Sequence, residues 1–429
     1  MAETDQQPAT ATATKIVVAA WFLTSIFYFY QYAMRSAPAV MVPELTAAFG
    51  LSAVGVASLI GLFYYGYAPF SLVAGVAMDQ LGPRKVVPLG AATVAVGSIL
   101  FSTADPTLAS IGRFMQGAGV FALIGAVFLV TSYMPASRAA TMIGATQMFG
   151  MAGGSAGQFA VGPLISSGVA WDRFWLAMGV VGIPIAALLL FLIPKRQQSA
   201  GGGPKAGLGP AVRAMGAVFV NPQSILCGLI AGLFFIPTTI FDMVWGVRYL
   251  QEAHDVPYSI AVLRSASVPF GWIIGCPLLG WLSDRIGRRK PVIVGAGLVL
   301  IGCLALILFV PAGTFPTYSL GLLAGIASGA AMIPYTVIKE ANRPEHAGTA
   351  TGVVNFLNFS TTAVLGPIFA GRLMAASQGG EREIAHYQMT FTPLLYGVGL
   401  AVLLTLLLRE TGPKARAKAA APIPTLVIP

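Results

Sequence analysis

Charged residues are scarce in this chain. Only 9% of its 429 residues are Asp, Glu, Lys or Arg, whereas about 25% of an average soluble domain is charged. Hydrophobic residues make up 56%. Apolar runs of about 20 residues, the length that crosses about 30 Å of hydrocarbon, recur along almost the whole chain. The composition predicts an all-α membrane protein and leaves no room for a soluble domain.

Cysteine and histidine are also rare. The cysteines fall within expected membrane spans, where an odd number argues against a disulfide framework; they are Cys227, Cys276 and Cys303. The histidines fall in expected loops, and no group of Cys and His has metal-ligand spacing; they are His254, His346 and His386. We therefore expect no metal site and no cofactor. A membrane enzyme is the least favoured class, because no catalytic constellation occurs within the spans.

The apolar runs predict twelve membrane-spanning helices, several of them long enough to tilt or kink. They are expected at residues 16–42, 52–78, 86–104, 108–133, 141–166, 174–193, 222–250, 258–283, 291–312, 317–340, 348–374 and 390–409. The longest polar connection, residues 194–214, separates six spans from six. The expected organisation is an N-terminal tail (1–15), a six-helix bundle (16–193), a linker (194–221), a second six-helix bundle (222–409) and a C-terminal tail (410–429).

Basic residues predict the orientation. Of the 25 Lys and Arg residues, eighteen fall on one side of the expected spans and four on the other, namely Arg173, Arg248, Arg372 and Arg382. Because basic loops stay in the cytoplasm, both termini are expected to be cytoplasmic in a bacterial inner membrane. The first nine residues contain no Lys or Arg, so we expect no secretory signal and a first span that stays in the mature protein. The dispersed charges do not favour nucleic-acid binding.

Two loop motifs repeat between the halves. "GVAMDQLGPRK" at 75–85 and "GWLSDRIGRRK" at 280–290 match Gly for Gly and Asp for Asp at an offset of 205 residues. The Gly-Pro pairs at 162–163 and 366–367 repeat at an offset of 204. Two six-helix halves related by a parallel repeat, with a cavity between them, form an architecture of secondary transporters. One chain is enough to form such a cavity, so we expect a functional monomer.

These motifs resemble those of the major facilitator superfamily, and the resemblance extends over roughly residues 16–410. The two loops are similar to the family's signature loops, and "RFMQGAG", from Arg113 to Gly119, is similar to its fourth-helix motif. The resemblance implies two pseudo-symmetric six-helix bundles and an inner gate, with Asp79, Gly82 and Arg84 in the first loop and Asp284, Gly287, Arg288 and Arg289 in the second. Each Asp, paired with arginine and held near a neighbouring helix terminus, can latch the gate, and the glycines allow tight turns.

The first helix resembles that of organophosphate:phosphate antiporters within the superfamily. In that group an arginine that matches Arg35, followed by Pro43 and Leu45, binds substrate phosphate, and a second arginine on the seventh helix assists. This chain instead has Asp242 in the middle of its seventh helix and Arg248 only near the end. The departure favours a monocarboxylate, a dicarboxylate or a zwitterion over a phosphate ester.

Three arginines lie within the expected spans, where a charge usually faces a cavity or a partner. Arg113 belongs to a motif and is expected to have a conformational or proton-linked role. Arg264 either binds substrate or snorkels to the outer interface. Arg35 lies about eight residues, or about 12 Å, from an expected helix end near Pro43, too deep for easy snorkelling. Hydroxyls and aromatic rings that can satisfy a guanidinium surround it, namely Tyr28, Gln31, Tyr32, Ser36, Tyr64, Tyr65 and Tyr67.

The other acidic residues belong to expected loops, tails, gates or helix ends, so Asp242 is the one acid left in a membrane core. It is the candidate proton carrier, because a buried carboxyl group can bind and release a proton as its hydration alternates. Its alternative roles are to bind a substrate ammonium, to neutralise Arg35, or to form a structural ion pair. Further lining candidates, which can instead join helices by hydrogen bonds, are Gln147, Gln158, Trp245, Tyr335, Asn355 and Asn358.

The sequence thus predicts a secondary transporter that moves a small organic anion by alternating access with proton symport. The first alternative is an efflux antiporter for drugs, siderophores or metabolites, since residues 153–163 resemble, with different spacing, the fifth-helix motif of drug antiporters. The second alternative is a membrane sensor or assembly factor on the same fold, for which no substrate flux is expected.

Overall fold

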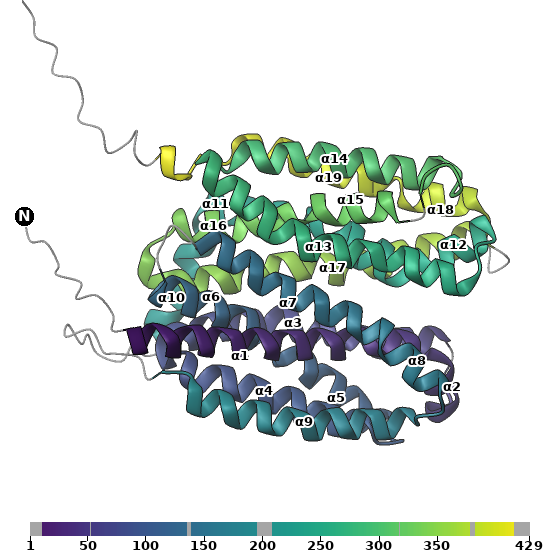
Figure 1. Cartoon of the computed structure of the whole chain (residues 1–429), viewed down its shortest axis with the longest axis horizontal. Coiled ribbons are helices and arrows are strands. Elements are labelled where there is room, and N and C mark those ends of the chain that lie inside the picture. Colours follow the sequence, from purple (N-terminus) through teal and green to yellow (C-terminus); the bar gives the residue numbers. More distant parts are fainter. Residues whose placement is uncertain are drawn as a thin grey trace, which may run out of the picture. The chain divides into compact units, whose positions relative to one another are not determined.

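The computed structural model describes residues 11–51, 53–134, 139–194, 208–316, 318–377 and 382–415. Every secondary-structure element in these ranges is helical (Figure 1). Most of the two expected tails and part of the expected linker lie outside the described residues, at 1–10, 416–429 and 195–207. The rest of the linker forms α10 (Leu208–Val220).

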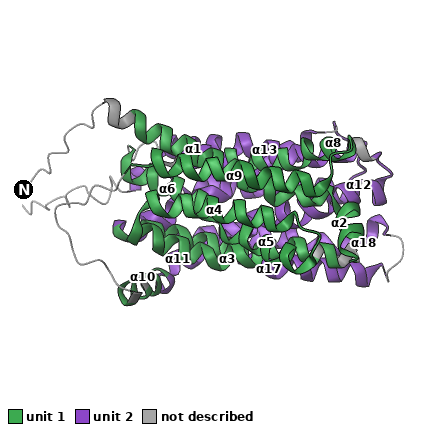
Figure 2. Cartoon of the chain, turned by 90° about the horizontal axis from the view of Figure 1, so that it is seen from below, with its two compact units in different colours: residues 1–139, 149–218, 345–359 green, residues 140–148, 219–344, 360–429 purple. Residues whose placement is uncertain are grey.

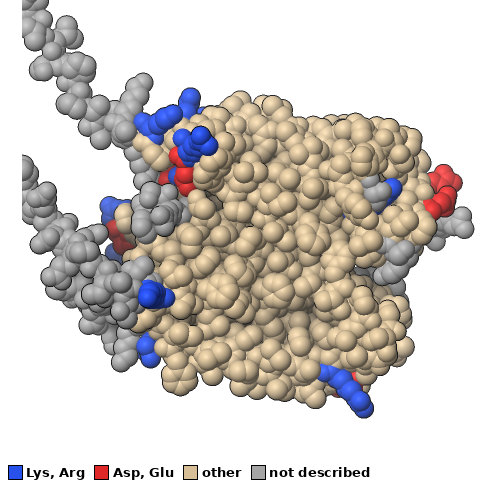
Figure 3. All heavy atoms as spheres, in the orientation of Figure 1, with Lys and Arg blue, Asp and Glu red and all other residues tan. Residues whose placement is uncertain are grey.

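Eleven helical segments in the described chain are long and apolar enough to cross a membrane, which confirms an all-α membrane protein. The other expected span, 141–166, corresponds to α7 (Ala139–Phe159) and α8 (Val161–Ser166). It is not among the eleven, because α7 is rich in glycine and polar residues and α8 is short. On the face drawn in Figure 3, charged side chains lie near the helix ends, and the surface along the helices carries none.

The chain forms two compact units (Figure 2). Unit 1 comprises residues 1–139, 149–218 and 345–359. Besides most of α7, α8 and α10, its elements are α1 (Ala11–Ser36), η1 (Ala37–Val40), α2 (Val42–Phe49), α3 (Ala53–Leu81), α4 (Pro83–Phe101), α5 (Pro106–Ala118), α6 (Phe121–Tyr133), α9 (Trp171–Leu192) and the first part of α17 (Ala347–Ala376). In its interior α4 packs against α5 and α9, and α3 packs against α5.

Unit 2 comprises residues 140–148, 219–344 and 360–429. Its elements are α11 (Pro222–Ile236), the π-helix η3 (Pro237–Gly246), α12 (Val247–His254), α13 (Tyr258–Ile286), α14 (Lys290–Phe309), α15 (Ser319–Ser328), η4 (Gly329–Met332), α16 (Ile333–Glu340), the rest of α17, α18 (Ile384–Phe391) and α19 (Pro393–Leu407). The short turn η5 (Pro344–His346) precedes α17. The six-plus-six division of the chain stays a prediction.

Several spans expected to be continuous are broken, and proline or glycine accompanies each break. The first span changes to a 3-10 turn at Ala37, next to Pro38. The fourth divides between α5 and α6 at Gly119, and the seventh changes from α-helix to π-helix at Pro237. Proline lacks the N–H that an α-helix requires, and π-helical segments often occur at functional sites.

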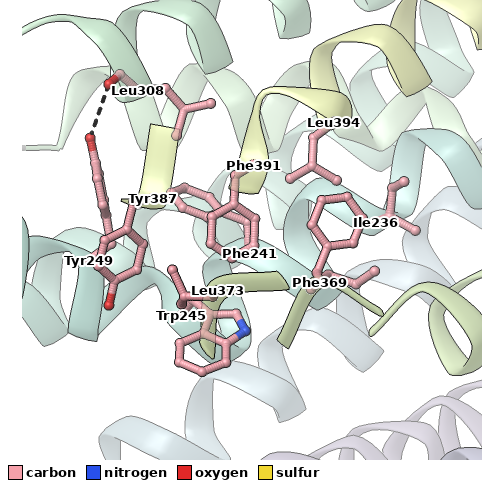
Figure 4. Packing of buried hydrophobic residues seen from close by; sticks show 11 residues of the cluster. Ile236, Phe241, Trp245, Tyr249, Leu308, Phe369, Leu373, Tyr387, Phe391 and Leu394 are labelled. Carbon is pink, nitrogen blue, oxygen red and sulfur yellow. Dashed lines mark hydrogen bonds between the residues drawn. The ribbon is translucent and has the colours of Figure 1, made fainter. Parts of the chain in front are cut away.

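One face of the seventh span packs into the apolar interior of unit 2. Phe241, Trp245 and Tyr249 pack there against aromatic and aliphatic side chains of α14, α17, α18 and α19, as Figure 4 shows. The ring centroids of Phe241 and Phe391 are 4.9 Å apart. This packing fixes the rotation of η3 and α12.

Glycines allow α3 and α5 to approach closely in unit 1. A Cβ atom added at Gly117 would collide with the backbone oxygen of Phe63, and one added at Gly66 would collide with that of Phe114. Helices in lipid associate through such close contacts between small residues, because the bilayer supplies no hydrophobic driving force between them.

We therefore expect Gly117→Leu to force α3 and α5 apart and to lower the melting temperature of the detergent-solubilised protein. Overpacking destabilises a protein by about 1–3 kcal/mol, which corresponds to a fall in melting temperature of roughly 5 °C. Gly302→Leu is the control, because a Cβ added at Gly302 would meet no atom within 4 Å. Equal melting temperatures of the two variants would contradict this interpretation.

Candidate functional site

Arg35 is in the last turn of α1, and only 3% of its surface is exposed. The helical span that carries it ends at Val40, near the expected end at about Pro43, but its last four residues are not α-helical. The α-helix ends at Ser36 and η1 follows, because Pro38 cannot continue the α-helical hydrogen bonding. Arg35 therefore lies five residues before the end of the span, and its side chain is as buried as expected.

Pro38 also explains how α1 is held against α5. The backbone oxygen of Met34 would normally accept a hydrogen bond from the N–H of residue 38, which proline lacks. Arg113 supplies the missing donor. Its guanidinium donates to four acceptors, which are the backbone oxygens of Met34 (2.9 Å), Arg35 (2.7 Å) and Ile60 (3.1 Å) and Oε1 of Gln116 (2.8 Å).

Arg113 is fully buried, and its guanidinium carbon also lies 4.9 Å from the centre of the Phe63 ring. We expected a conformational or proton-linked role for this residue. Since its donors bind backbone oxygens of α1 and α3, the arrangement favours a positioning role. Arg113 holds the turn of α1 that carries Arg35.

Four tyrosines surround Arg35 closely enough to interact with it electrostatically, and they are Tyr28, Tyr32, Tyr64 and Tyr67. The guanidinium carbon of Arg35 lies 3.9 Å from the centre of the Tyr32 ring, a cation–π contact. The Tyr28 and Tyr32 rings meet edge to face with centroids 4.5 Å apart. Tyr65, which we grouped with them, is 56% exposed, because it points to another side of α3 from Tyr64 and Tyr67.

Two polar atoms in the helical turn before Arg35 are buried and have no hydrogen-bond partner among the described residues. They are the hydroxyl of Tyr32 and Oε1 of Gln31. The other amide atom of Gln31, Nε2, donates to the backbone oxygen of Gln116 at 3.4 Å. Buried polar groups in folded proteins almost always have partners, so these two atoms mark positions where a polar ligand or water is needed.

The first part of α17 brings further expected lining residues into unit 1. Asn355 and Asn358 are buried, and Nδ2 of Asn355 donates to Oγ of Ser71 at 2.9 Å. Phe359, which the sequence did not single out, contacts Tyr67 with ring centroids 4.3 Å apart. Gln158, on α7, is half-buried.

The first signature loop connects α3 with the beginning of α17. Oδ1 of Asp79 accepts from the N–H of Gly348 at 3.0 Å, and Oδ2 accepts from the N–H and hydroxyl of Thr349 at 2.7 and 2.6 Å. A carboxylate at a helix N-terminus is stabilised by the free N–H groups and the helix dipole. Gly82 adopts φ +76° in the turn, and Arg84 donates to the backbone oxygen of Ile193 at 3.3 Å.

The second signature loop uses an ion pair instead. Arg289 lies 2.6 Å from Asp284 and 3.0 Å from Glu340. Burial alone would lower the pKa of Arg289, but the hydrogen bonds and charges of Glu340 and Asp284 raise it above its usual value. Arg288 is exposed, so Arg289 is the arginine that binds Asp284. Gly287, at φ +71°, makes the turn.

Unit 2 contains a cavity of about 100 Å³ between its seventh to tenth spans, which Asp242, His254 and Arg264 all line. Asp242 is 8% exposed, and its Oδ1 accepts from Oγ of Ser265 at 3.0 Å. Arg264 is half-buried and donates to the backbone oxygen of Ala312 at 3.1 Å. The expectation of loops at His254 and His386 is wrong, because His254 ends α12 and His386 lies in α18.

The remaining candidates lie elsewhere in unit 2. Trp245 packs in the aromatic interior, where the guanidinium carbons of Arg248 and Arg382 lie 5.8 and 5.6 Å from its ring centre. Tyr335 and Gln147 are each 1% exposed, and neither lines the cavity that contains Asp242. Sequence reasoning missed Ser265, His254 and Ser328 as cavity residues.

Apolar helical spans, duplicated Asp–Gly loops and buried ionisable groups within each unit are the features of a secondary transporter. The chain belongs to the Major Facilitator Superfamily, since the family model of that name matches residues 24–367. The expected family is thus confirmed, and the chain is a multi-pass membrane protein of a transporter family rather than an enzyme.

Two characterised relatives extend over most of the chain. The membrane sensor protein UhpC of Salmonella typhimurium is 25% identical, over 91% of this chain and 90% of its own length. The hexuronate transporter of Bacillus subtilis is 24% identical, over 80% of this chain and 84% of its own. Among solved structures, the proton:xylose symporter XylE matches with a TM-score of 0.72 at 14% identity, over 93% of this chain and 97% of its own. At that identity the structural match shows the fold alone.

Replacement of Arg113 tests its positioning role. Arg113→Met removes four hydrogen bonds and leaves the backbone oxygen of Met34 without a donor, which costs about 1–3 kcal/mol for the unsatisfied group. We expect a lower melting temperature and increased hydrogen–deuterium exchange at residues 33–40. Arg248→Met is the control, because Arg248 is exposed. Unchanged exchange at residues 33–40 in Arg113→Met would show that Arg113 does not hold this turn.

Proposed function

We propose that this secondary transporter moves a small organic anion carrying a carboxylate, with proton symport by alternating access. Arg35 binds the carboxylate, Asp242 carries the coupled proton, and the two signature loops form the inner gate. Both termini are cytoplasmic in a bacterial inner membrane, and one chain is the functional unit. The burial of Arg35 among four tyrosines is the observation that carries the proposal.

The surroundings of Arg35 support an anionic ligand. A positive charge held away from water is costly unless an opposite charge or polar groups compensate it. The Tyr32 ring covers the guanidinium at 3.9 Å, and the unpartnered Tyr32 hydroxyl and Gln31 Oε1 belong to the preceding turn of α1. A carboxylate supplies negative charge to Arg35 and an acceptor to the hydroxyl, and a substrate hydroxyl group can donate to Gln31.

A carboxylate fits better than a phosphate ester. The seventh span has Asp242 in its buried π-helical segment, and its arginine, Arg248, is exposed on α12. Arg113, the other buried arginine near Arg35, already donates to four acceptors of unit 1, so Arg35 alone is proposed to match the single charge of a carboxylate. The hexuronate transporter of Bacillus subtilis, by its name, carries such a compound, which supports the same class of substrate.

The position of Asp242 supports proton coupling. Its carboxyl group is 8% exposed and accepts a hydrogen bond from Ser265, and it forms no ion pair within the part of the chain that the structure describes. A buried carboxyl group without a cation favours its neutral, protonated form. A structural ion pair, one of the alternatives for Asp242, therefore loses support.

Transport into liposomes tests this function. Purified protein should accumulate a labelled carboxylate from a panel containing a hexuronate, an aromatic carboxylate and a dicarboxylate, when the outside is acidic. Asp242→Asn should lose accumulation driven by the pH gradient while retaining exchange of labelled for unlabelled substrate. Glu252→Gln, at the surface of unit 2, is the matched carboxylate control. Gradient-driven accumulation by Asp242→Asn at the wild-type level would exclude Asp242 as the proton carrier.

A sensor is the second candidate, because UhpC, a membrane sensor protein, is 25% identical over 91% of this chain. A sensor would bind a carboxylate through Arg35 and produce no flux. Binding without gradient-driven or exchange transport, for the same ligand and the same protein preparation, would favour the sensor.

A further inference from the structure

We infer that protons reach Asp242 through the cavity inside unit 2, along a water-filled path that begins at His254. The inference rests on the proposed proton coupling by Asp242. All described residues that line this cavity belong to unit 2, and none of them comes from the unit that holds Arg35. Protons and substrate would then approach the protein by different routes.

The cavity extends along the seventh span. Asp242 lies at one end, in η3, and His254 lies twelve residues further on, at the end of α12. The stretch between them consists of the end of the π-helix and the whole of α12. The connection between α14 and α15 also lines the cavity, through Pro311, Ala312 and Pro316. The cavity therefore leads from an end of the spans to the buried carboxyl group.

The walls contain polar atoms that require water. Oγ of Ser328, a residue 1% exposed, and Nε of Arg264 are buried and have no hydrogen-bond partner among the described residues. Both residues line the cavity together with Asp242 and Ser265. A polar cavity of about 100 Å³ has room for several waters, because about 10–15 Å³ of probe-occupied volume is enough for one. It is too small for an organic substrate, whose pockets usually measure about 300–1,000 Å³.

Hydrogen bonds at the outer end prepare His254 to accept a proton. The Tyr249 hydroxyl donates to the backbone oxygen of Ile307 at 2.7 Å, so its oxygen accepts from Nε2 of His254 at 2.9 Å. This assignment of the hydrogen follows from the donors and acceptors available. In the neutral ring the proton then sits on Nε2, and Nδ1 is the basic nitrogen.

The transfer moves one proton and leaves every other bond intact. Nδ1 of His254 takes a proton from the solvent and passes it to the nearest cavity water. The last water then gives a proton to the Asp242 carboxylate. The charged and titratable groups that face this path are Asp242 from η3, Tyr249 and His254 from α12 and Arg264 from α13, with Asp255 beside His254. Because Arg264 is positive, it opposes a lasting charge on His254 and favours onward transfer.

Infrared spectroscopy of the full-length protein tests the path without a substrate. The carbonyl stretch of protonated Asp242 is identified as the band that Asp242→Asn removes, and its rate of hydrogen–deuterium exchange is measured after a change to D₂O. Ala324→Leu fills the cavity, and Gly302→Leu adds the same side chain where a Cβ meets no atom within 4 Å. We expect Ala324→Leu to slow the exchange about tenfold or more, the scale of a lost proton-transfer group, and Gly302→Leu to leave it unchanged.

His254→Gln is the second variant, and it tests the proton path even if Ala324→Leu does not fold. Glutamine can still donate to the Tyr249 hydroxyl but cannot shuttle a proton. Exchange at Asp242 should slow, and imidazole in the outer buffer should restore it. Wild-type exchange in both variants would overturn the path and leave the coupling role of Asp242 intact. If Asp242→Asn instead keeps gradient-driven transport, the proposed coupling itself fails.

Discussion

The structure around the candidate anion site depends on one constraint, which is that a guanidinium buried among apolar helices needs acceptors. Arg113 obtains them from backbone oxygens of Met34, Arg35 and Ile60. The oxygen of Met34 is available because Pro38 has no N–H to offer it. One proline thus ends the α-helix, frees an acceptor and allows α5 to fix the turn that carries Arg35. Arg113 uses its charge inside the fold, whereas Arg35 lies among tyrosine rings and is proposed to bind the ligand.

The ionisable groups are divided between the units. Arg35 and its tyrosines belong to unit 1, while Asp242, His254 and Arg264 line a cavity of unit 2. In the proposed symporter, unit 1 therefore binds the organic anion and unit 2 binds the proton. Coupling between them then requires a conformational change whose equilibrium both ligands shift. The π-helical segment that contains Asp242 has the irregular hydrogen bonding that suits such a change.

Composition and motifs predicted the family, the membrane spans and the embedded charges, because hydropathy and charge act over many residues. Gly82 and Gly287 adopt the positive φ that tight turns require. Helical periodicity alone would have separated exposed Tyr65 from Tyr64 and Tyr67. The role of Pro38 was also readable, since a proline four residues after Met34 must free its carbonyl. The cavity could not be predicted from the sequence. Whether the side chains of Ser328 and His254 point into it depends on the π-helix and on packing between spans that are far apart in the sequence.

The central claim is that Arg35 binds the charge of a carboxylate. Isothermal titration of the purified protein with a hexuronate and with the uncharged amide of the same sugar acid tests it directly, in wild type and in Arg35→Gln. The account predicts that the wild type binds the carboxylate about tenfold or more tightly than the amide, the scale of one charge-assisted hydrogen bond, and that Arg35→Gln abolishes this difference. An equal preference for the carboxylate in both proteins would contradict the account.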